Sequence, residues 1–421
     1  MPFFARFVPY RELWSLHNIR WLVLIRFLAN IIFYSTVIVQ YESSRGLNFT
    51  EMFMLESIIA LAALVFNLPT GILADQLGYK GVLFLGYGLC VVSVAIFAFT
   101  YGFWWFALGD LLFGAGIASI SGCEDALMYE SLPSEGPLAS GRVTELATAA
   151  FALLNAASSA GFVSGLCVGS FIGARSPALA VIASIIPLAL AWMMTLKLHP
   201  IGRRESQLHD RLKVAPLGAG DLLRSATRVV REQPAAVGLS LFSSAAFALV
   251  QAIFWYNQPY FTRAGITIAW FGPIMAVAVG LQMLVTLTTP RVKQRLGQAT
   301  ALALSCILPG IAYMLLPVAR VPALAAVLVA TVASVQAWRQ PIVNDELNRC
   351  IADGARATTL SVLSVLGTLA GVVLNPLIGH VGDLGLDVTG VSLGLSLILL
   401  GCVVPLLTGK RARLSEPPGI D

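Results

Sequence analysis

The chain has 421 residues, of which 57% are hydrophobic and only 12% are charged, and its formal net charge is +5. Soluble domains carry about 25% charged residues, so this chain has too little polar surface to cover the core of a soluble protein of its length. Its apolar runs are about 20 residues long, the length that spans roughly 30 Å of hydrocarbon. The composition excludes a soluble globular protein and predicts an all-α polytopic membrane protein.

Twelve membrane spans are predicted in chain order. The first six cover 19–41, 51–73, 81–100, 103–128, 141–171 and 176–197. The second six cover 234–261, 268–290, 299–317, 321–347, 357–380 and 389–409. Between the two sets, the polar stretch from His199 to Gln233 holds seven lysines and arginines. We therefore expect an N-terminal six-helix bundle (1–198), a basic linker (199–233) and a C-terminal six-helix bundle (234–421).

The distribution of lysine and arginine predicts the orientation of the spans. With the N-terminus inside, 21 of the 27 basic residues fall on the cytoplasmic side and only four fall outside, namely Arg45, Arg175, Arg263 and Arg320. Cytoplasmic loops of membrane proteins carry such an excess of positive charge. The protein is therefore expected to lie in the inner membrane of the cell, with both termini and the linker in the cytoplasm. The net positive charge then needs no nucleic-acid partner to explain it.

Two short sequence echoes indicate that the halves are repeats. GRVTEL at 141–146 resembles ARATTL at 355–360, and ADQLG at 74–78 resembles KQRLG at 293–297. The two pairs have nearly the same separation along the chain and lie at matching places in the two sets of spans. Internal repeats of this kind are typical of transporter folds, in which the substrate site lies at the repeat interface. The sequence thus predicts twelve transmembrane helices in two pseudo-symmetric six-helix bundles.

The loop after span two, GILADQLGYKG, has the residues of a tight turn at the membrane surface. Gly71 permits a tight helix exit, Asp75 is placed to meet the positive N-terminal end of the next helix, and Gly78 allows a reversed turn. Lys80 follows at the cytoplasmic surface. These four residues resemble the loop signature of the major facilitator superfamily, G-x-x-x-D-x-x-G-x-K/R, and a degenerate copy, TPRVKQRLG, follows span eight.

The resemblance, to the bacterial twelve-helix type of this superfamily, extends over nearly the whole chain. It implies two bundles around a central cavity lined mainly by spans one, four, seven and ten, and transport by rocker-switch alternating access. It also implies that Asp75 latches the bundles in one state; a plain helix cap is the alternative. Two patterns of proton-coupled members are missing: span four has Asp110 in place of an arginine, and span five lacks a Gly-Pro pair. Span five instead carries Gly161, Gly165 and Gly169 at a spacing that permits close helix packing.

Polar residues share one face of each span that the superfamily places at the cavity, as judged by helical periodicity. The candidate substrate-binding residues on these faces are Arg26, Asn30, Tyr34, Gln251, Trp255, Gln336 and Arg339. Arginine inside a span is costly, so Arg26 and Arg339 should face a cavity or a partner. They could bind an anionic group of the substrate or pair with acidic neighbours. Trp255 could stack on a ring or a cation or contribute only to packing.

Two carboxylates inside spans are candidate proton carriers. Asp110 lies deep in span four, and Glu56 lies near the outer side of span two. A carboxylate buried in a transporter can bind and release a proton during the cycle. The alternatives are a carboxylate satisfied by hydrogen bonds for Asp110 and a position at the membrane surface for Glu56.

A cluster of acids near the end of span four predicts a charge gate. In SGCEDALMYESL (121–132), Glu124 and Asp125 lie about 5 Å below the cytoplasmic surface and Arg26 lies about 10 Å below it, at 1.5 Å per helical residue. We therefore expect the two acids to pair with Arg26 or Arg142. The candidate gating residues are Gly71, Asp75, Gly78, Lys80, Glu124, Asp125, Arg142, Asp345, Glu346 and Arg356.

The leading interpretation is a proton-coupled secondary transporter that exports a small organic molecule, because the predicted cavity faces are apolar and aromatic. The alternative within this class is a proton-coupled importer of an anionic metabolite that uses Arg26 and Arg339. A transport-inactive receptor and a membrane enzyme are the remaining alternatives. The four histidines are not grouped, the six cysteines form no CxxC pair, and no GxxxxGK[ST] phosphate loop occurs. We expect no catalytic site, no metal and no cofactor, and a monomer in the lipid bilayer.

Overall fold

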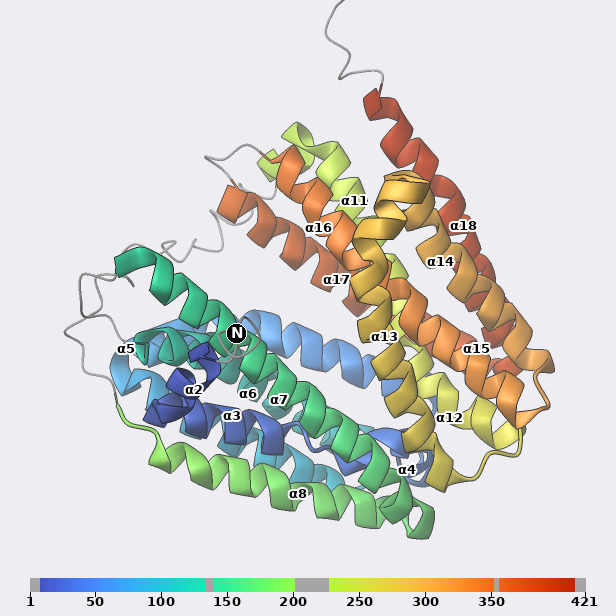
Figure 1. Ribbon diagram of the computed structural model, residues 1–421. Helices are drawn as coiled ribbons and strands as arrows, with labels where there is room; N and C mark the ends of the chain where they lie inside the picture. Colours follow the sequence, from blue (N-terminus) through green and yellow to red (C-terminus); the bar gives the residue numbers. More distant parts are fainter. Residues whose placement is uncertain (1–7, 133–138, 201–226, 352–355, 413–421) are drawn as a thin grey trace, which may run out of the picture. The chain divides into compact units, whose positions relative to one another are not determined.

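The computed structural model describes residues 8–132, 139–200, 227–351 and 356–412 (Figure 1). Its described residues contain 12 helical segments that are long and apolar enough to cross a membrane. They cover His17–Thr36, Phe49–Asn67, Pro69–Phe99, Phe103–Glu130, Thr144–Arg175, Pro177–Lys197, Pro234–Arg263, Ile268–Leu296, Gln298–Val318, Pro322–Arg349, Thr358–Asp383 and Leu386–Val404. The predicted all-α fold with twelve spans is confirmed, and the protein is a multi-pass membrane protein.

The chain divides into two compact units. The first holds Met1–Gly46 and Ile58–Pro216, and the second holds Leu47–Ser57 and Leu217–Asp421. The start of helix α5 (Phe49–Phe99) therefore belongs to the second unit and the rest of α5 to the first. The other elements of the first unit are α2 (Val8–Ser15), α3 (His17–Ala29), η1 (Phe33–Thr36), α4 (Ile38–Ser44), α6 (Phe103–Glu130), α7 (Ala139–Arg175), α8 (Pro177–Met194) and η2 (Thr195–Lys197).

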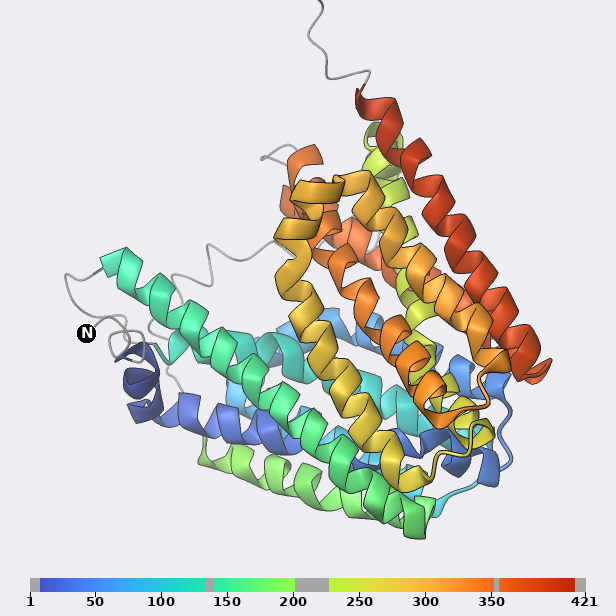
Figure 2. The same ribbon diagram turned by 45° about the vertical axis from the view of Figure 1, so that its right-hand side comes forward.

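The second unit holds the last six spans. Its elements are α11 (Pro234–Gln251), α12 (Ile253–Arg263), α13 (Ile268–Leu296), α14 (Gln298–Leu315), η4 (Leu316–Val318), α15 (Pro322–Val335), η5 (Gln336–Trp338), α16 (Arg339–Cys350), α17 (Arg356–Asp383) and α18 (Leu386–Ala412). Helices α14 and α18 lie side by side over most of their length (Figure 2). Proline opens α11 and α15, where its missing N–H removes no helical hydrogen bond.

Span one is not a continuous helix. Helix α3 ends at Ala29, the backbone is extended at Ile32 (φ −110, ψ 94), and α4 begins only at Ile38. The amide of Phe33 donates to the hydroxyl oxygen of Ser184 on the neighbouring helix α8 at 3.0 Å. Irregular backbone persists at membrane depth only where neighbouring groups satisfy its donors and acceptors. Helix α8 supplies such a group for span one.

Glycines on α7 let this helix approach the broken part of span one. A Cβ atom added to Gly165 would lie 2.6 Å from the amide nitrogen of Ile32, and one added to Gly161 would meet the carbonyl oxygen of Phe27. Small residues at four-residue spacing allow such close contact between helices in membranes. The predicted close packing of α7 is confirmed against α3 and η1.

Two glycines at equivalent places in the halves share one unusual backbone conformation. Gly78 has φ 72 and ψ 161, and Gly297 has φ 79 and ψ 163. Only glycine adopts such angles without steric cost. These residues end the echoed sequences ADQLG and KQRLG, so the sequence repeat is also a repeat of backbone structure. The reversed turn predicted at Gly78 is confirmed.

Spans seven and ten are also broken in the second unit. Helix α11 ends at Gln251 and α12 begins at Ile253, and the 3₁₀ turn η5 separates α15 from α16. A 3₁₀ stretch inside a longer helix often marks a hinge or a strained sequence. Both breaks lie beside residues that the sequence predicts to bind substrate, namely Gln251, Gln336 and Arg339.

Candidate functional site

An ion pair between a half-buried arginine and a buried glutamate joins two spans of the first unit. Arg26 on α3 donates through Nε to Oε2 of Glu124 on α6. The hydroxyl of Tyr87 on α5 donates to the other carboxylate oxygen at 2.7 Å. Glu124 is only 1% exposed. Both oxygens of this buried carboxylate are therefore satisfied, as buried charges require.

Asp125 extends this cluster toward the surface. Its Oδ1 lies 3.6 Å from Nη2 of Arg26, and its side chain is half exposed. One arginine is thus flanked by two carboxylates, as the comparison of depths predicts. The pairing is observed, whereas its use as a gate stays a prediction.

The face predicted for span one does not continue past Ala29, because the prediction assumed an unbroken helix. Asn30 ends α3 and its side-chain Nδ2 donates to the carbonyl oxygen of Arg26 at 2.8 Å. Tyr34 lies beyond the break, in η1, and is half-buried. The helical-wheel alignment of Tyr34 with Arg26 is therefore wrong, although both remain candidates for substrate binding.

The two candidate proton carriers differ in burial. Asp110 on α6 is 5% exposed. Glu56 on the first part of α5 is half-buried. Within the described part of the chain, Glu56 forms no ion pair. Their roles in proton coupling stay predictions.

The aromatic residues of span seven have partners within the second unit. Trp255 lies 5.7 Å from the ring of Phe53, centroid to centroid, in a tilted arrangement. The adjacent Tyr256 donates to the carbonyl oxygen of Ile378 on α17 at 2.8 Å. Gln251 closes α11 at the break and is half-buried. Trp255 and Tyr256 accordingly pack against aromatic residues at the start of α5.

The break in span ten carries two buried candidate residues. Gln336 opens η5 and Arg339 opens α16, and they are 5% and 2% exposed. Oε1 of Gln336 accepts from Nη2 of Arg339 at 3.3 Å. Trp338 between them donates to the hydroxyl oxygen of Thr288 on α13 at 2.8 Å. Arginine and glutamine thus lie together inside the second unit.

The four signature residues lie around the turn in α5. Gly71 and Asp75 are on the helix before Gly78, and both are exposed. Lys80, after the turn, donates through Nζ to the carbonyl oxygen of Leu196 at the end of span six, at 2.8 Å. Lys80 therefore satisfies a carbonyl that the end of a helix leaves without an intrahelical partner.

The acids near the end of span ten form a second charge cluster. Asp345 pairs with Nζ of Lys293 and lies 3.2 Å from Nη2 of Arg349. Glu346 accepts from Nε2 of Gln298 at 2.9 Å. Lys293 opens the loop copy KQRLG and Gln298 directly follows it, so the cluster ties this loop to α16. The predicted partners Arg142 and Arg356 have side chains outside the described residues.

Sequence reasoning missed two residues of the buried clusters, Tyr87 and Cys306. The thiol of Cys306 on α14 lies beside the guanidinium of Arg339. These two residues lie on spans three and nine, outside the four spans that the superfamily places at the cavity. The separation of Tyr87 and Cys306 along the chain equals that of ADQLG and KQRLG. Their equivalent positions in the repeat are the sequence feature that could have indicated them.

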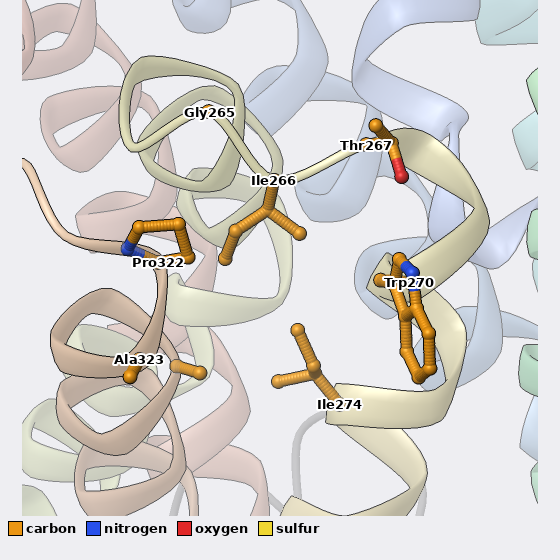
Figure 3. Close-up of a pocket in the computed structure, with 8 residues that line it drawn as sticks. Gly265, Ile266, Thr267, Trp270, Ile274, Pro322 and Ala323 are labelled. Carbon is orange, nitrogen blue, oxygen red and sulfur yellow. The ribbon is translucent and has the colours of Figure 1, made fainter.

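One pocket of about 420 Å³ opens at the surface of the second unit (Figure 3). It lies between the loop before α13, the start of α13 and the start of α15, and Ile266 and Ile274 both reach into it. Its lining includes none of the predicted substrate-binding residues. Among the described residues, no group of three potential metal ligands occurs.

Comparison with known proteins supports these observations. A family model described as Major Facilitator Superfamily matches residues 20–375. The solved nucleoside transporter NupG is similar with a TM-score of 0.75 at 14% identity, over 93% of this chain and 98% of that one. A bacterial homolog of the human lysosomal transporter Spinster gives 0.69 at 15% identity, over 98% and 100% of the two chains. A POT family transporter in complex with 5-aminolevulinic acid gives 0.69 at 12% identity, over 93% and 96%.

No curated protein sequence matches the chain. The structural likenesses, at 12 to 15% identity, show the fold alone. The family model covers most of the sequence, including the loop signature and the intramembrane arginines Arg26 and Arg339. The chain belongs to the Major Facilitator Superfamily of secondary transporters.

Proposed function

We propose that the protein exports a small organic molecule across the inner membrane, in exchange for protons, by rocker-switch alternating access. In this proposal both termini and the basic linker are cytoplasmic, and the protein acts as a monomer without a cofactor. The candidate residues on spans one, seven and ten bind the substrate. The two charge clusters, around Arg26 and around Asp345, open and close the cytoplasmic side.

The observation that carries the proposal is the set of ionisable residues held inside the spans. Glu124 is buried and paired with Arg26, Asp110 is buried in the same span as Glu124, and Arg339 is buried in span ten. Such residues are costly in a membrane and are retained where they serve a pathway or a coupling step. Their presence in a member of this superfamily favours transport over a receptor or an enzyme.

Asp110 and Glu56 are the proposed proton carriers. Asp110 is the more deeply buried of the two, and Glu56 forms no ion pair within the described residues. A proton carrier must change its protonation state during the cycle, which a carboxylate held by a permanent arginine partner does less readily. For this reason Glu124, paired with Arg26, is assigned to the gate.

A second candidate function is proton-coupled import of an anionic metabolite. It is favoured by the different surroundings of the two arginines, because Arg26 is already neutralised by carboxylates whereas Arg339 is not. The similar POT family structure contains 5-aminolevulinic acid, which carries a carboxylate. Of the two arginines named in this alternative, the structure favours Arg339.

Purified protein in liposomes that contain a pH-sensitive dye provides the test. Under an imposed pH gradient, addition of a transported compound should produce proton flux, and the sign of the linked fluxes separates antiport from symport. Asp110→Asn or Glu56→Gln should abolish gradient-driven accumulation while leaving downhill exchange of the substrate. Gradient-driven transport at the wild-type rate in both variants would remove these residues as carriers.

Glu232→Gln is the matched control for the loss of a carboxylate. Glu232 lies outside the spans, and its exposed side chain makes only a 3.8 Å surface pair with Arg228. This variant should transport as the wild type does. If no compound in a broad panel of cations, neutral solutes and anions moves under any gradient, the transport proposal itself is wrong.

A further inference from the structure

The guanidinium of Arg339 is buried with most of its donors unused. Nη2 is engaged by Gln336, whereas Nε and Nη1 are shielded from solvent and have no hydrogen-bond partner. Arginine has five N–H donors in a planar fork and no acceptor. The N–H groups on Nε and Nη1 of this guanidinium are therefore donors without an acceptor.

The groups around Arg339 are polar but uncharged. Ser305 and Cys306 on α14 are fully buried, and the Ser305 hydroxyl donates to the carbonyl oxygen of Leu302 at 2.7 Å. The Cys306 thiol and the Gln336 amide lie beside the guanidinium. Within the described part of the chain, no carboxylate forms an ion pair with Arg339. Among the described residues of the second unit, this positive charge has no counter-charge.

In the first unit, the buried charge of Glu124 has a structural role and is paired. There Glu124 is matched by Arg26 and by the Tyr87 hydroxyl. Adding the separations of the two echoed sequence pairs to the residue number of Glu124 gives the range 338–343. This range contains Arg339. The region of the second half that corresponds to Glu124 therefore contains a buried cation, Arg339. A buried charge without a partner is strongly destabilising, so its position favours a ligand.

We propose that Arg339, with Gln336 beside it, binds an oxyanion of the transported molecule. The planar fork of arginine matches the two oxygens of a carboxylate or a phosphate, and both groups present this chemistry. The inference rests on the proposed transport function for the identity of its ligand, and it holds for export and import alike.

The break in span ten supplies a means of reaching the site. Arg339 directly follows η5, the tightened turn that interrupts this span. Such turns inside longer helices occur at hinges. Movement of α16 against α15 would bring the guanidinium to the ligand, and the anion would then neutralise the buried charge.

Thermal unfolding of the purified protein, followed by tryptophan fluorescence, tests the proposal without requiring transport. The probes are inorganic phosphate, sulfate, benzoate and succinate, compared with sodium chloride at equal ionic strength. Benzamide and succinamide serve as uncharged counterparts of the two carboxylates. The wild type should show a saturable rise in unfolding temperature with at least one oxyanion and none with the amides. The carboxylate and phosphate arms identify which group the site takes.

Three variants separate binding at Arg339 from general effects of charge. Arg339→Gln should weaken the anion response by about 10- to 100-fold, the loss of charged hydrogen bonds. Cys306→Asp places a carboxylate beside the guanidinium and should also abolish the response, while Arg339 is retained. Arg320→Gln removes an exposed arginine in a loop and should leave the response unchanged.

The outcomes are distinct. An anion response that survives in Arg339→Gln, or that is absent from the wild type for every oxyanion, overturns the proposal. If Arg339→Gln does not fold, an anion response that persists in Cys306→Asp has the same meaning. Transport of neutral solutes without anion binding would refute this inference and leave the transport function standing. Anion binding without any flux would support anion binding at this site and refute the transport function.

Discussion

At the scale of single residues, the protein treats its buried charges in two ways. Arg26 and Glu124 neutralise each other, and Tyr87 completes the hydrogen bonding of the carboxylate. Arg339 has the Gln336 amide and the Cys306 thiol beside it, and its Nε and Nη1 have no hydrogen-bond partner. Removing one member of a buried pair leaves the other uncompensated, whereas removing both members often costs little. The pair and the lone arginine should therefore respond differently to neutralisation.

We expect Arg26→Gln to lower the free energy of unfolding by about 3–5 kcal/mol, because it leaves Glu124 buried and unpaired. The double variant Arg26→Gln/Glu124→Gln should recover most of this loss. Denaturant titrations of the wild type, both single variants and the double variant form a double-mutant cycle that measures the coupling. Additive effects of the two single changes would show that the pair contributes no coupling energy.

At the scale of elements, the ends and contacts of the helices are specified by a few polar groups and glycines. Helix α5 begins with a reciprocal capping box, in which the amide of Asn48 donates to Glu51 at 3.0 Å and the amide of Glu51 donates to Asn48 at 2.8 Å. Asp383 at the end of α17 accepts from the amides of Phe49 and Thr50 at 2.8 and 3.0 Å. Two elements distant in sequence therefore share one cap.

Asp383→Ala should lower the free energy of unfolding by about 0.5–2 kcal/mol, the usual cost of losing an N-cap acceptor. The amides of Phe49 and Thr50 should then exchange with deuterium faster than in the wild type, which mass spectrometry of the first turn of α5 measures. Asp387→Asn is the control, since its exposed side chain pairs with Arg263 rather than with an amide of α5. Unchanged exchange in Asp383→Ala would argue against the shared cap.

Gly165→Ala should destabilise the first unit by about 1–3 kcal/mol, the typical cost of forcing a methyl group into a filled contact. The added Cβ would lie 2.6 Å from the amide nitrogen of Ile32, so α7 must move away from span one. Gly122→Ala is matched to it, because Gly122 is also helical and no atom lies within 4 Å of its added Cβ. Thermal unfolding of both variants decides the matter: equal unfolding temperatures would contradict the close approach of α7.

At the scale of the whole molecule, the distribution of basic residues should set the orientation. With the native cysteines replaced, Ser43→Cys should react with an impermeant maleimide in intact cells. Ser206→Cys, in the basic linker, should react only after permeabilisation. Loops rich in lysine and arginine are retained on the cytoplasmic side, and the linker has the longest such run. The reverse labelling pattern would overturn the proposed topology.

The twelve spans could be predicted because each is a long apolar run, a property of composition that tertiary contacts do not change. The pairing of Arg26 with Glu124 and Asp125 also followed from depth along straight helices near one surface. The break at Asn30 could not be predicted, because no proline or glycine lies near it in the sequence. It depends on a group of another span, the Ser184 hydroxyl that receives the Phe33 amide. The break at Gln336 has a local cause that the sequence shows, because Pro341 cannot donate a hydrogen bond to the carbonyl of Ala337. That no described residue forms an ion pair with Arg339 became visible only in the structure.

The way span one is held has a consequence for the order of assembly during synthesis. Its broken backbone is satisfied by Ser184, and its first residues, His17 and Asn18, hydrogen-bond to Lys197 and His199 at the end of span six. These partners emerge from the ribosome long after the segment that needs them, because most of the first unit separates the two in sequence. Until span six is inserted, span one therefore lies in the membrane without the hydrogen-bond partners that span six provides. The first six spans should consequently acquire protease resistance in a single late step, when the sixth arrives, rather than helix by helix.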